Sequence, residues 1–223
     1  MNIQWAASPN FTVGRSGKKI IAIVDHITAG LMPGTLSWMR NPTAKASAHY
    51  LVTKAGEIYQ LVKDEDTAWH AGEVKKPNWP LYDGSNPNRY TIGIEHEALG
   101  GESLTEAQYQ ATLELHRMLV KRYSIPIDSD HIIGHNRIDA VNRPNDPGPL
   151  FPWQRLLTNL TGQGSKYKPG IVTVPIILPT GKIEGPILNI DGSDRTYVPV
   201  RELAEALGYK VRWDEITRTV TIR

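Results

Sequence analysis

The chain of 223 residues contains no cysteine. Disulfides and a thiol nucleophile are therefore excluded, and any metal site must be built from histidine and carboxylate ligands. No stretch approaches the roughly 20 apolar residues that a membrane span requires. The polar N-terminus, interrupted by Pro9, also lacks the continuous apolar run of a secretory signal. We therefore expect a protein without a membrane span, synthesised in the cytoplasm without a signal peptide.

An excess of charge of one sign is also lacking. The chain has 25 basic and 23 acidic residues, a formal net charge of +2 and a pI near 8.7. No polyanion-binding tract dominates, so we expect no nucleic-acid partner. The slight basic excess is compatible with an anionic substrate. At 40% hydrophobic and 22% charged residues, the length suits one globular core with a small second unit.

Strand and helix patterns follow one another from Ile20 to Leu160, which predicts an α/β fold. The β-branched run 20–24 predicts a buried strand with Asp25 and His26 at its C-terminal end. Residues 47–62, "SAHYLVTKAGEIYQLV", predict a hairpin, and "YTIGIEHEA" predicts a further strand. In that strand Glu95 points away from the face of the isoleucines, because successive side chains alternate.

The clearest helix is expected from Thr105 to about Arg122, with Thr105 as N-cap and Gln108 completing a capping box. "DHIIGH" predicts a short strand, and a short helix should begin near Pro152. Residues 162–170 have the Gly, Ser and Lys content of a linker.

The chain is therefore expected to have a larger domain at 1–161 and a small α+β C-terminal module at 171–223. In the module, "IVTVPIIL" and "ILNI" predict strands, "VPVRELAEALG" a helix and "YKVRWDEITRTVTIR" a closing hairpin.

Most of the seven histidines are expected to be structural. His116 lies on the apolar stripe of the long helix and His49 within a strand, and both positions favour packing. His131 and His135 are four residues apart, but "HIIGH" lacks the glutamate of a helical zinc motif and is poorly helical, so at most one is expected to bind a metal. His26 ends a buried strand at a rim where sites form, and by itself fits either role.

The acidic candidates are equally ambiguous when taken one at a time. Asp146 is held in a Pro- and Gly-rich loop, "NDPGP", which is also an ordinary turn sequence. Glu95 and Glu97 fit either a solvated strand face or a catalytic acid.

Taken together, these segments resemble a known family. From about Ile20 to Leu160 the chain resembles the zinc-dependent N-acetylmuramoyl-L-alanine amidases shared by phage endolysins, bacterial autolysins and peptidoglycan recognition proteins. The matching segments occur in the family's order: "IVDHITAG", "SAHYLVTKAGEIYQLV", "TAWHAGE", "YTIGIEHEA", "LTEAQYQATLELHRML" and "DHIIGHNRID" leading to "NDPGPLFPW". The resemblance implies a central mixed β-sheet flanked by helices.

The resemblance also implies the site. One Zn²⁺ ion would be held by His26, His135 and Asp146, which leaves a fourth position open for water, as a catalytic zinc requires. Zinc lowers the pKa of such a water to about 7 and polarises a carbonyl. Glu95 matches the family's general base and acid, and Glu97 is the alternative if the register differs.

Oxyanion stabilisation departs from the family pattern. Some members carry a lysine two residues before the metal-binding acid, where this chain has Pro144, and others use a tyrosine where this chain has Ala48. Oxyanion stabilisation must then come from the metal alone, or from Arg143, Asn145 or backbone N–H groups. Of these alternatives, we expect the metal to be assisted by Asn145 or Arg143.

Trp69 and His70 of "AWHAG" also match a family motif. They suit the rim of a groove for a sugar-peptide substrate. Packing of Trp69 on the sheet, with His70 at its edge, is an equally good interpretation.

The C-terminal module resembles the N-terminal-like domain of copper amine oxidases, on the pattern "YVPVRELAEALGYKVRWDEITRTVTI". Copper chemistry is not implied, because the tail contains no histidine, cysteine or methionine. Its position after a lytic domain suggests attachment to the cell wall.

The resemblance implies an amidase that cleaves bacterial peptidoglycan between N-acetylmuramic acid and the L-alanine of the stem peptide. The alternative is a non-catalytic peptidoglycan-binding protein on the same scaffold, and a third possibility is that the three ligand candidates are unrelated structural residues. Recognition proteins typically lack one zinc ligand, whereas all three ligand positions and Glu95 are filled here. We expect a monomer that acts at the cell wall, with release assisted by a holin if the protein is encoded by a phage.

Overall fold

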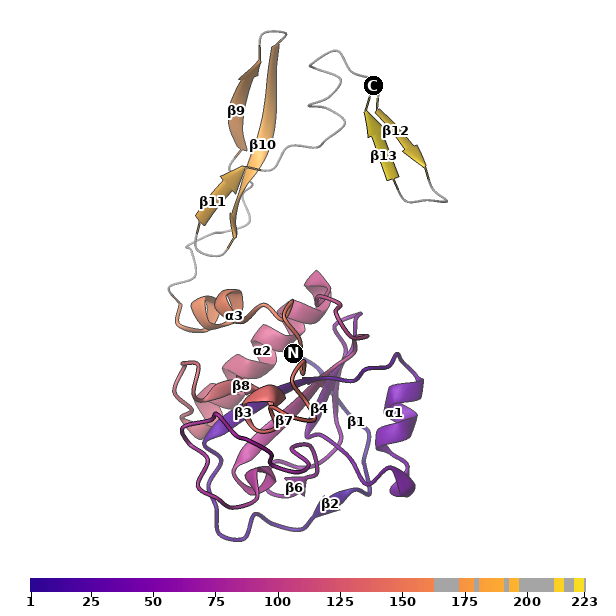
Figure 1. Ribbon diagram of the computed structural model, residues 1–223, viewed down its shortest axis with the longest axis vertical. Coiled ribbons are helices and arrows are strands. Elements are labelled where there is room, and N and C mark those ends of the chain that lie inside the picture. Colours follow the sequence, from indigo (N-terminus) through magenta and orange to yellow (C-terminus); the bar gives the residue numbers. More distant parts are fainter. Residues whose placement is uncertain (163–172, 179–180, 191–192, 197–210, 215–218, 223) are drawn as a thin grey trace. The chain divides into compact units, whose positions relative to one another are not determined.

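The structure is a computed structural model that describes residues 1–162, 173–178, 181–190, 193–196, 211–214 and 219–222. The chain divides into two compact units, Met1–Gln163 and Gly164–Arg223, and both are drawn in Figure 1.

A six-stranded sheet forms the centre of the first unit (Figure 1). In spatial order its strands are β1 (Ile3–Trp5), β5 (Ile58–Gln60), β4 (Tyr50–Val52), β7 (Thr91–His96), β3 (Ala22–Ile27) and β8 (Ile132–Gly134). The neighbours β4, β7, β3 and β8 are parallel, whereas β5 is antiparallel to β4 and parallel to β1. The prediction of an α/β fold with a mixed central sheet is therefore confirmed.

The parallel strands bring the chemically important residues to one edge of the sheet. In the register of β3 and β7, His26 lies opposite Glu95. On the other side of β3, Asp25 lies opposite Gly134, so His135 follows at the same edge. The carboxyl ends of neighbouring parallel strands are where open α/β sheets place their sites.

The long helix α2 runs over Glu106–Tyr123, close to its predicted bounds. Thr105 caps its start, and its hydroxyl accepts the Gln108 backbone N–H at 3.1 Å. The predicted reciprocal capping box is wrong in its second half, because the Gln108 side chain donates to the carbonyls of Val52 and Glu97, both at 3.0 Å. The helix is thereby tied to the ends of two strands.

The main core lies between α2 and one face of the sheet, as Figure 1 shows. Its fully buried members are Ile23, Tyr50, Val52, Ile58, Ile92, Ile94, Leu115, Leu119 and Ile125. The last helix, α3 (Trp153–Leu160), packs against α2 through a second cluster centred on Tyr109, Phe151 and Leu156. Burial of these side chains is the main stabilisation that the fold has available.

The remaining elements of the first unit are short. They are β2 (Phe11–Thr12), which pairs with β6 (Thr67–Ala68), the helix α1 (Gly34–Met39), and the single 3₁₀ turns η1 (Pro42–Ala44), η2 (Pro87–Arg89) and η3 (His135–Arg137). Within the described ranges, none of the helices combines the length and apolar character needed to cross a membrane.

In the second unit, β9 (Thr173–Leu178), β10 (Gly181–Ile190) and β11 (Ser193–Thr196) form an antiparallel sheet. A separate antiparallel pair, β12 (Val211–Asp214) and β13 (Thr219–Ile222), corresponds to the predicted closing hairpin. The helix predicted for "VPVRELAEALG" lies outside the described residues.

Candidate metal centre

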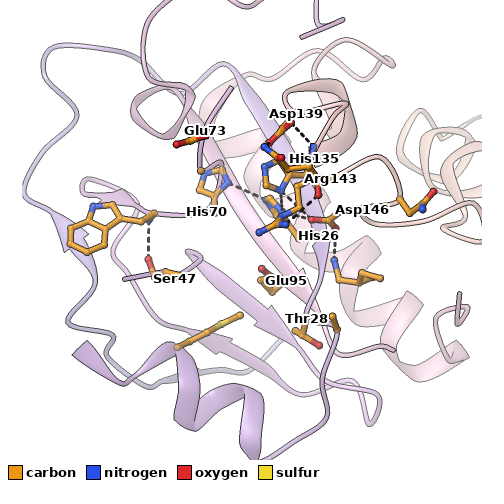
Figure 2. Close-up of a pocket in the computed structure, with 18 of the residues that line it drawn as sticks. His26, Thr28, Ser47, His70, Glu73, Glu95, His135, Asp139, Arg143 and Asp146 are labelled. Carbon is orange, nitrogen blue, oxygen red and sulfur yellow. Dashed lines mark hydrogen bonds and ion pairs between the residues drawn. The ribbon is translucent and has the colours of Figure 1, made fainter. Parts of the chain in front are cut away.

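Three side chains converge at the carboxyl edge of the sheet (Figure 2). His26 lies near the end of β3, His135 opens the turn η3 directly after β8, and Asp146 lies in the loop that follows. Nδ1 of His26 is 3.1 Å from Nδ1 of His135 and 3.3 Å from Oδ2 of Asp146, and the same oxygen is 3.1 Å from Nδ1 of His135. Two nitrogens and one oxygen therefore form a nearly equilateral triangle.

The triangle has the dimensions of a tetrahedral metal site. Ligands roughly 2.0–2.1 Å from a tetrahedral Zn²⁺ are about 3.3 Å from one another, close to the observed separations of 3.1–3.3 Å. Two imidazoles and one carboxylate are also a ligand set that zinc prefers, and they leave a fourth position open. The residues present therefore fit a catalytic zinc ion.

The ring nitrogens that face away from the triangle also have partners. Nε2 of His135 donates to the carbonyl oxygen of Ala71 at 2.9 Å, so its proton is on Nε2 and Nδ1 keeps a free lone pair. Burial lowers the pKa of His26, although the Asp146 carboxylate acts in the opposite direction. The neutral imidazole, which is the form that binds a metal, is thus favoured.

Asp146 is held by backbone contacts on both sides. Its Oδ1 accepts the Ile27 N–H at 2.8 Å, which leaves Oδ2 for the triangle, and its carbonyl accepts the Asn136 N–H at 3.0 Å. Gly134 permits this close approach, because a Cβ there would lie 2.6 Å from Cδ of Pro147. The carboxylate is therefore preorganised by the surrounding loop.

Asp139, which was not among the predicted site residues, fixes the start of the same loop. Its carboxylate accepts the N–H groups of Val141 and Asn142 at 3.1 and 2.9 Å and the Asn142 side chain at 2.7 Å, and it is only 3% exposed. An acid followed two and three residues later by loop amides is an Asx-turn pattern, so the signal was present in "RIDAVN".

Glu95 lies at the end of β7, opposite His26 in the register, and it lines the same groove. Its Oε2 is buried and has no hydrogen-bond partner among the described residues. Burial, reinforced by repulsion from Asp146, raises the pKa of Glu95 well above its usual range, and the positive charge of Arg143 opposes this. Glu95 is thus a carboxyl group that can take up a proton at the site.

Glu97, the alternative, has a different environment. Its Oε1 accepts the Met32 N–H at 2.9 Å and its Oε2 accepts the Lys54 N–H at 2.7 Å. Both oxygens are therefore occupied in joining the segment before α1 to the β4–β5 turn, and this arrangement favours Glu95 as the reacting acid.

The site opens into a groove of about 1070 Å³. Beyond the residues already described, its lining includes Trp38, Lys45 and Trp69 together with Glu73, Lys75 and Arg143. Lys45 lies directly after the turn η1, and Lys75 lies in the loop between β6 and η2. The helix residue Trp38, 57% exposed, had no signal in the sequence. The lining combines aromatic rings with both signs of charge, which suits a sugar-peptide.

The four other predicted site residues are all in the groove lining. Arg143 and Asn145 are exposed on the loop before Asp146. Trp69 is held by its indole N–H, which donates to Thr12 Oγ1 at 3.0 Å. His70 is only 7% exposed and lies behind His26, with His26 Nε2 3.1 Å from its Nδ1 (Figure 2).

Comparisons with known proteins agree with this geometry. The N-acetylmuramoyl-L-alanine amidase family matches residues 16–149, and the copper amine oxidase N-terminal domain matches residues 185–223. N-acetylmuramoyl-L-alanine amidase A of Achromobacter lyticus is 29% identical in an alignment of 179 residues that covers 72% of this chain and 94% of that protein.

Two further relatives are larger than the matched region. The 1,6-anhydro-N-acetylmuramyl-L-alanine amidase AmpD of Enterobacter cloacae is 37% identical over 54% of this chain, and the match spans 60% of AmpD. The amidase AmiD of E. coli, solved with anhydro-N-acetylmuramic acid-L-Ala-D-γ-Glu-L-Lys, superimposes with a TM-score of 0.55 at 31% identity, covering 69% of this chain and 59% of AmiD.

Proposed function

The chain belongs to the N-acetylmuramoyl-L-alanine amidase family, and from this membership we propose that it hydrolyses the amide bond between the lactyl group of N-acetylmuramic acid and the L-alanine of the stem peptide. Its substrate is then bacterial peptidoglycan, and it acts at the cell wall. The observation that carries the proposal is the triangle of His26, His135 and Asp146, with Glu95 in the same groove.

The complete set of polar groups favours an enzyme over a peptidoglycan-binding protein. Binding alone requires neither three converging metal ligands nor a buried acid with an unpartnered oxygen beside them. A buried, unsatisfied carboxylate costs stability, so its presence in a groove points to chemistry.

We propose one zinc ion as the resident cofactor, held by His26, His135 and Asp146. When bound, zinc supplies the Lewis acidity that activates a water molecule and polarises the scissile carbonyl. All three residues line the groove, so a metal ion held by them would be accessible to a substrate there.

Glu95 then moves the proton. It accepts a proton from the attacking water as the hydroxyl adds to the carbonyl carbon, and it returns that proton to the nitrogen of L-alanine as the carbon–nitrogen bond breaks. The raised pKa of Glu95 suits both halves of this transfer, because the protonated form can persist until the amine leaves.

Arg143 and Asn145 are our candidates for stabilising the oxyanion, because Pro144 occupies the position where other members carry a lysine. Loss of an oxyanion donor costs roughly 10²–10³ in kcat. We expect Arg143→Ala or Asn145→Ala to show a loss of that kind with little change in KM. Lys63→Ala, at an exposed ion pair outside the groove lining, is the control.

The proposed reaction is tested by product analysis of digested cell walls. We expect new alanine N-termini without new reducing sugar ends, and loss of activity when a chelator removes the metal. New reducing ends would show that a glycosidic bond is cleaved and would contradict the proposal. Walls that bind the protein but yield neither product would point to the peptidoglycan-binding alternative.

A further inference from the structure

His70 is connected to the metal ligand His26 on one side and to Thr91 on the other. Its Nδ1 lies 3.1 Å from Nε2 of His26, and its Nε2 lies 3.1 Å from Oγ1 of Thr91. His70 and Thr91 are both buried, at 7% and 0% exposure. These contacts run from Thr91, the first residue of β7, through His70 to His26 in the metal triangle.

The proton positions along this line are fixed by its far end. The Thr91 hydroxyl donates to the Pro87 carbonyl at 2.8 Å, so its oxygen is left to accept the Nε2–H of His70. A neutral imidazole has one N–H, so Nδ1 of His70 is an acceptor and must receive the Nε2–H of His26. Nδ1 of His26 then carries a lone pair, and this is the nitrogen in the metal triangle.

The fold makes room for the ring of His70 and fixes its backbone. A Cβ on Gly93 would lie 2.3 Å from Cγ of His70, so only glycine in β7 allows the ring to lie there. Oδ1 of Asn88 accepts the N–H groups of both His70 and Ala71, at 3.1 and 2.7 Å. Since the Ala71 carbonyl holds His135, one short segment orients both imidazole ligands.

We propose that His70 is a positioning residue of the metal centre, locking His26 as the Nε2–H tautomer and thereby raising the affinity for the metal, rather than a residue that contacts the substrate. The inference rests on the proposed zinc site. Outer partners of metal-binding histidines typically contribute 10–100-fold in affinity.

The first test measures Zn²⁺ affinity by competition with a chromophoric chelator. We expect His70→Phe, which keeps a ring but removes both hydrogen bonds, to bind Zn²⁺ 10–100-fold more weakly. His70→Asn, whose side-chain oxygen can stand near the place of Nδ1, should recover at least part of this loss. A folded His70→Phe protein with wild-type affinity would overturn the proposal.

A pair of threonine variants covers the case in which His70→Phe does not fold. Thr91→Val removes the hydroxyl that fixes the proton of His70, and we expect a several-fold loss of Zn²⁺ affinity. Thr112→Val is the matched control, because Thr112 is equally buried and its hydroxyl has no hydrogen-bond partner in the described part of the chain. Equal Zn²⁺ affinities of the two variants would contradict the proposed line of hydrogen bonds from Thr91 through His70 to His26.

A second readout needs neither metal nor activity. In ¹⁵N-histidine spectra of the metal-free protein, His26 should appear as the Nε2–H tautomer, and Thr91→Val should shift this signal while Thr112→Val leaves it unchanged. An Nδ1–H tautomer of His26 would exclude the proposed role. Wild-type protein that binds Zn²⁺ tightly without cleaving cell walls would refute the proposed function alone, because the role of His70 is decided by affinity and tautomer.

Discussion

Glu95 and Glu97 lie two residues apart, yet only Glu95 has a carboxylate oxygen left without a partner in the described structure. The strand β7 ends at His96, so Glu97 already belongs to the loop, where two backbone N–H groups occupy its oxygens. We therefore propose separate roles for the two acids, proton transfer for Glu95 and holding the rim of the site together for Glu97.

This difference predicts opposite phenotypes for the same substitution. We expect Glu95→Gln to retain zinc and the wild-type melting temperature but to lose roughly 10²–10⁴ in kcat, because the amide cannot carry the proton. Glu97→Gln should instead lose about 1–3 kcal/mol of unfolding free energy, since one backbone N–H loses its acceptor. Metal analysis, thermal unfolding and turnover of a muramyl peptide separate the two, and full turnover by Glu95→Gln would refute its assigned role.

The loop after β8 links two of the proposed metal ligands. It carries Asp146, and it packs against Gly134, the end of β8, which directly precedes His135. Gly134→Ala would place a methyl group 2.6 Å from Cδ of Pro147 and 3.1 Å from the Asp146 carbonyl. The loop must move away, so Oδ2 of Asp146 should leave the triangle. We expect at least a tenfold loss of Zn²⁺ affinity and about 1–3 kcal/mol of stability.

Gly34→Ala is the matched control for that substitution. A Cβ at Gly34, at the start of α1, would meet no atom within 4 Å, so zinc affinity and stability should change little. Equal zinc affinity of Gly134→Ala and the wild type, measured by chelator competition, would mean that the loop is not held in the way described.

The elements differ in how far the sequence could predict them. The helix α2 was predictable because its cap and its apolar stripe are local signals, and His116 on that stripe is indeed buried, 3.2 Å from Asp25. The strand β1 gave no local signal, because three residues become a strand only by pairing with Ile58–Gln60, more than fifty positions away.

The candidate site also combines residues that the sequence could predict with residues that it could not. The three candidate metal ligands could be proposed from the order of the sequence segments, and the structure brings them together. The position of His70 behind His26 could not, since it depends on the space that Gly93 leaves in a neighbouring strand. Tertiary contacts of this kind have no counterpart in local sequence patterns.

For the molecule as a whole, buried neutral histidines make folding sensitive to acid. Burial lowers the pKa of His49 to about 3, with the Arg15 guanidinium acting in the same direction. The Gly93 N–H donates to Nδ1 of His49 at 3.0 Å, so a second ring proton has no place in the folded state. In the unfolded chain a histidine titrates near 6.5.

The sign of the effect follows from these two values. Below pH 6.5 His49 binds a proton in the unfolded chain but not in the folded protein. The contribution of neutral His49 to the free energy of unfolding is therefore fully present above that pH and is lost as the pH drops toward 3. From pH 7.5 to pH 5 the loss due to His49 is about 2 kcal/mol. Urea unfolding at both pH values, with chelator present, should show a smaller pH dependence for His49→Gln. An unchanged dependence in that variant would contradict this origin.

The second unit lies outside the region that carries the proposed chemistry. All proposed catalytic and metal-binding residues lie within 16–149, whereas the copper amine oxidase N-terminal domain match begins at residue 185. We propose the module at 171–223 as a wall-binding unit, which would raise the local concentration of the catalytic unit on its insoluble substrate.

Deleting 171–223 should then leave turnover of a soluble muramyl peptide within about twofold but weaken co-sedimentation with intact walls roughly tenfold or more. Because the module carries seven basic and seven acidic residues, it has no net charge to attract an anionic wall, so the lost binding should depend little on salt. Unchanged co-sedimentation after the deletion would assign wall binding to the catalytic groove alone.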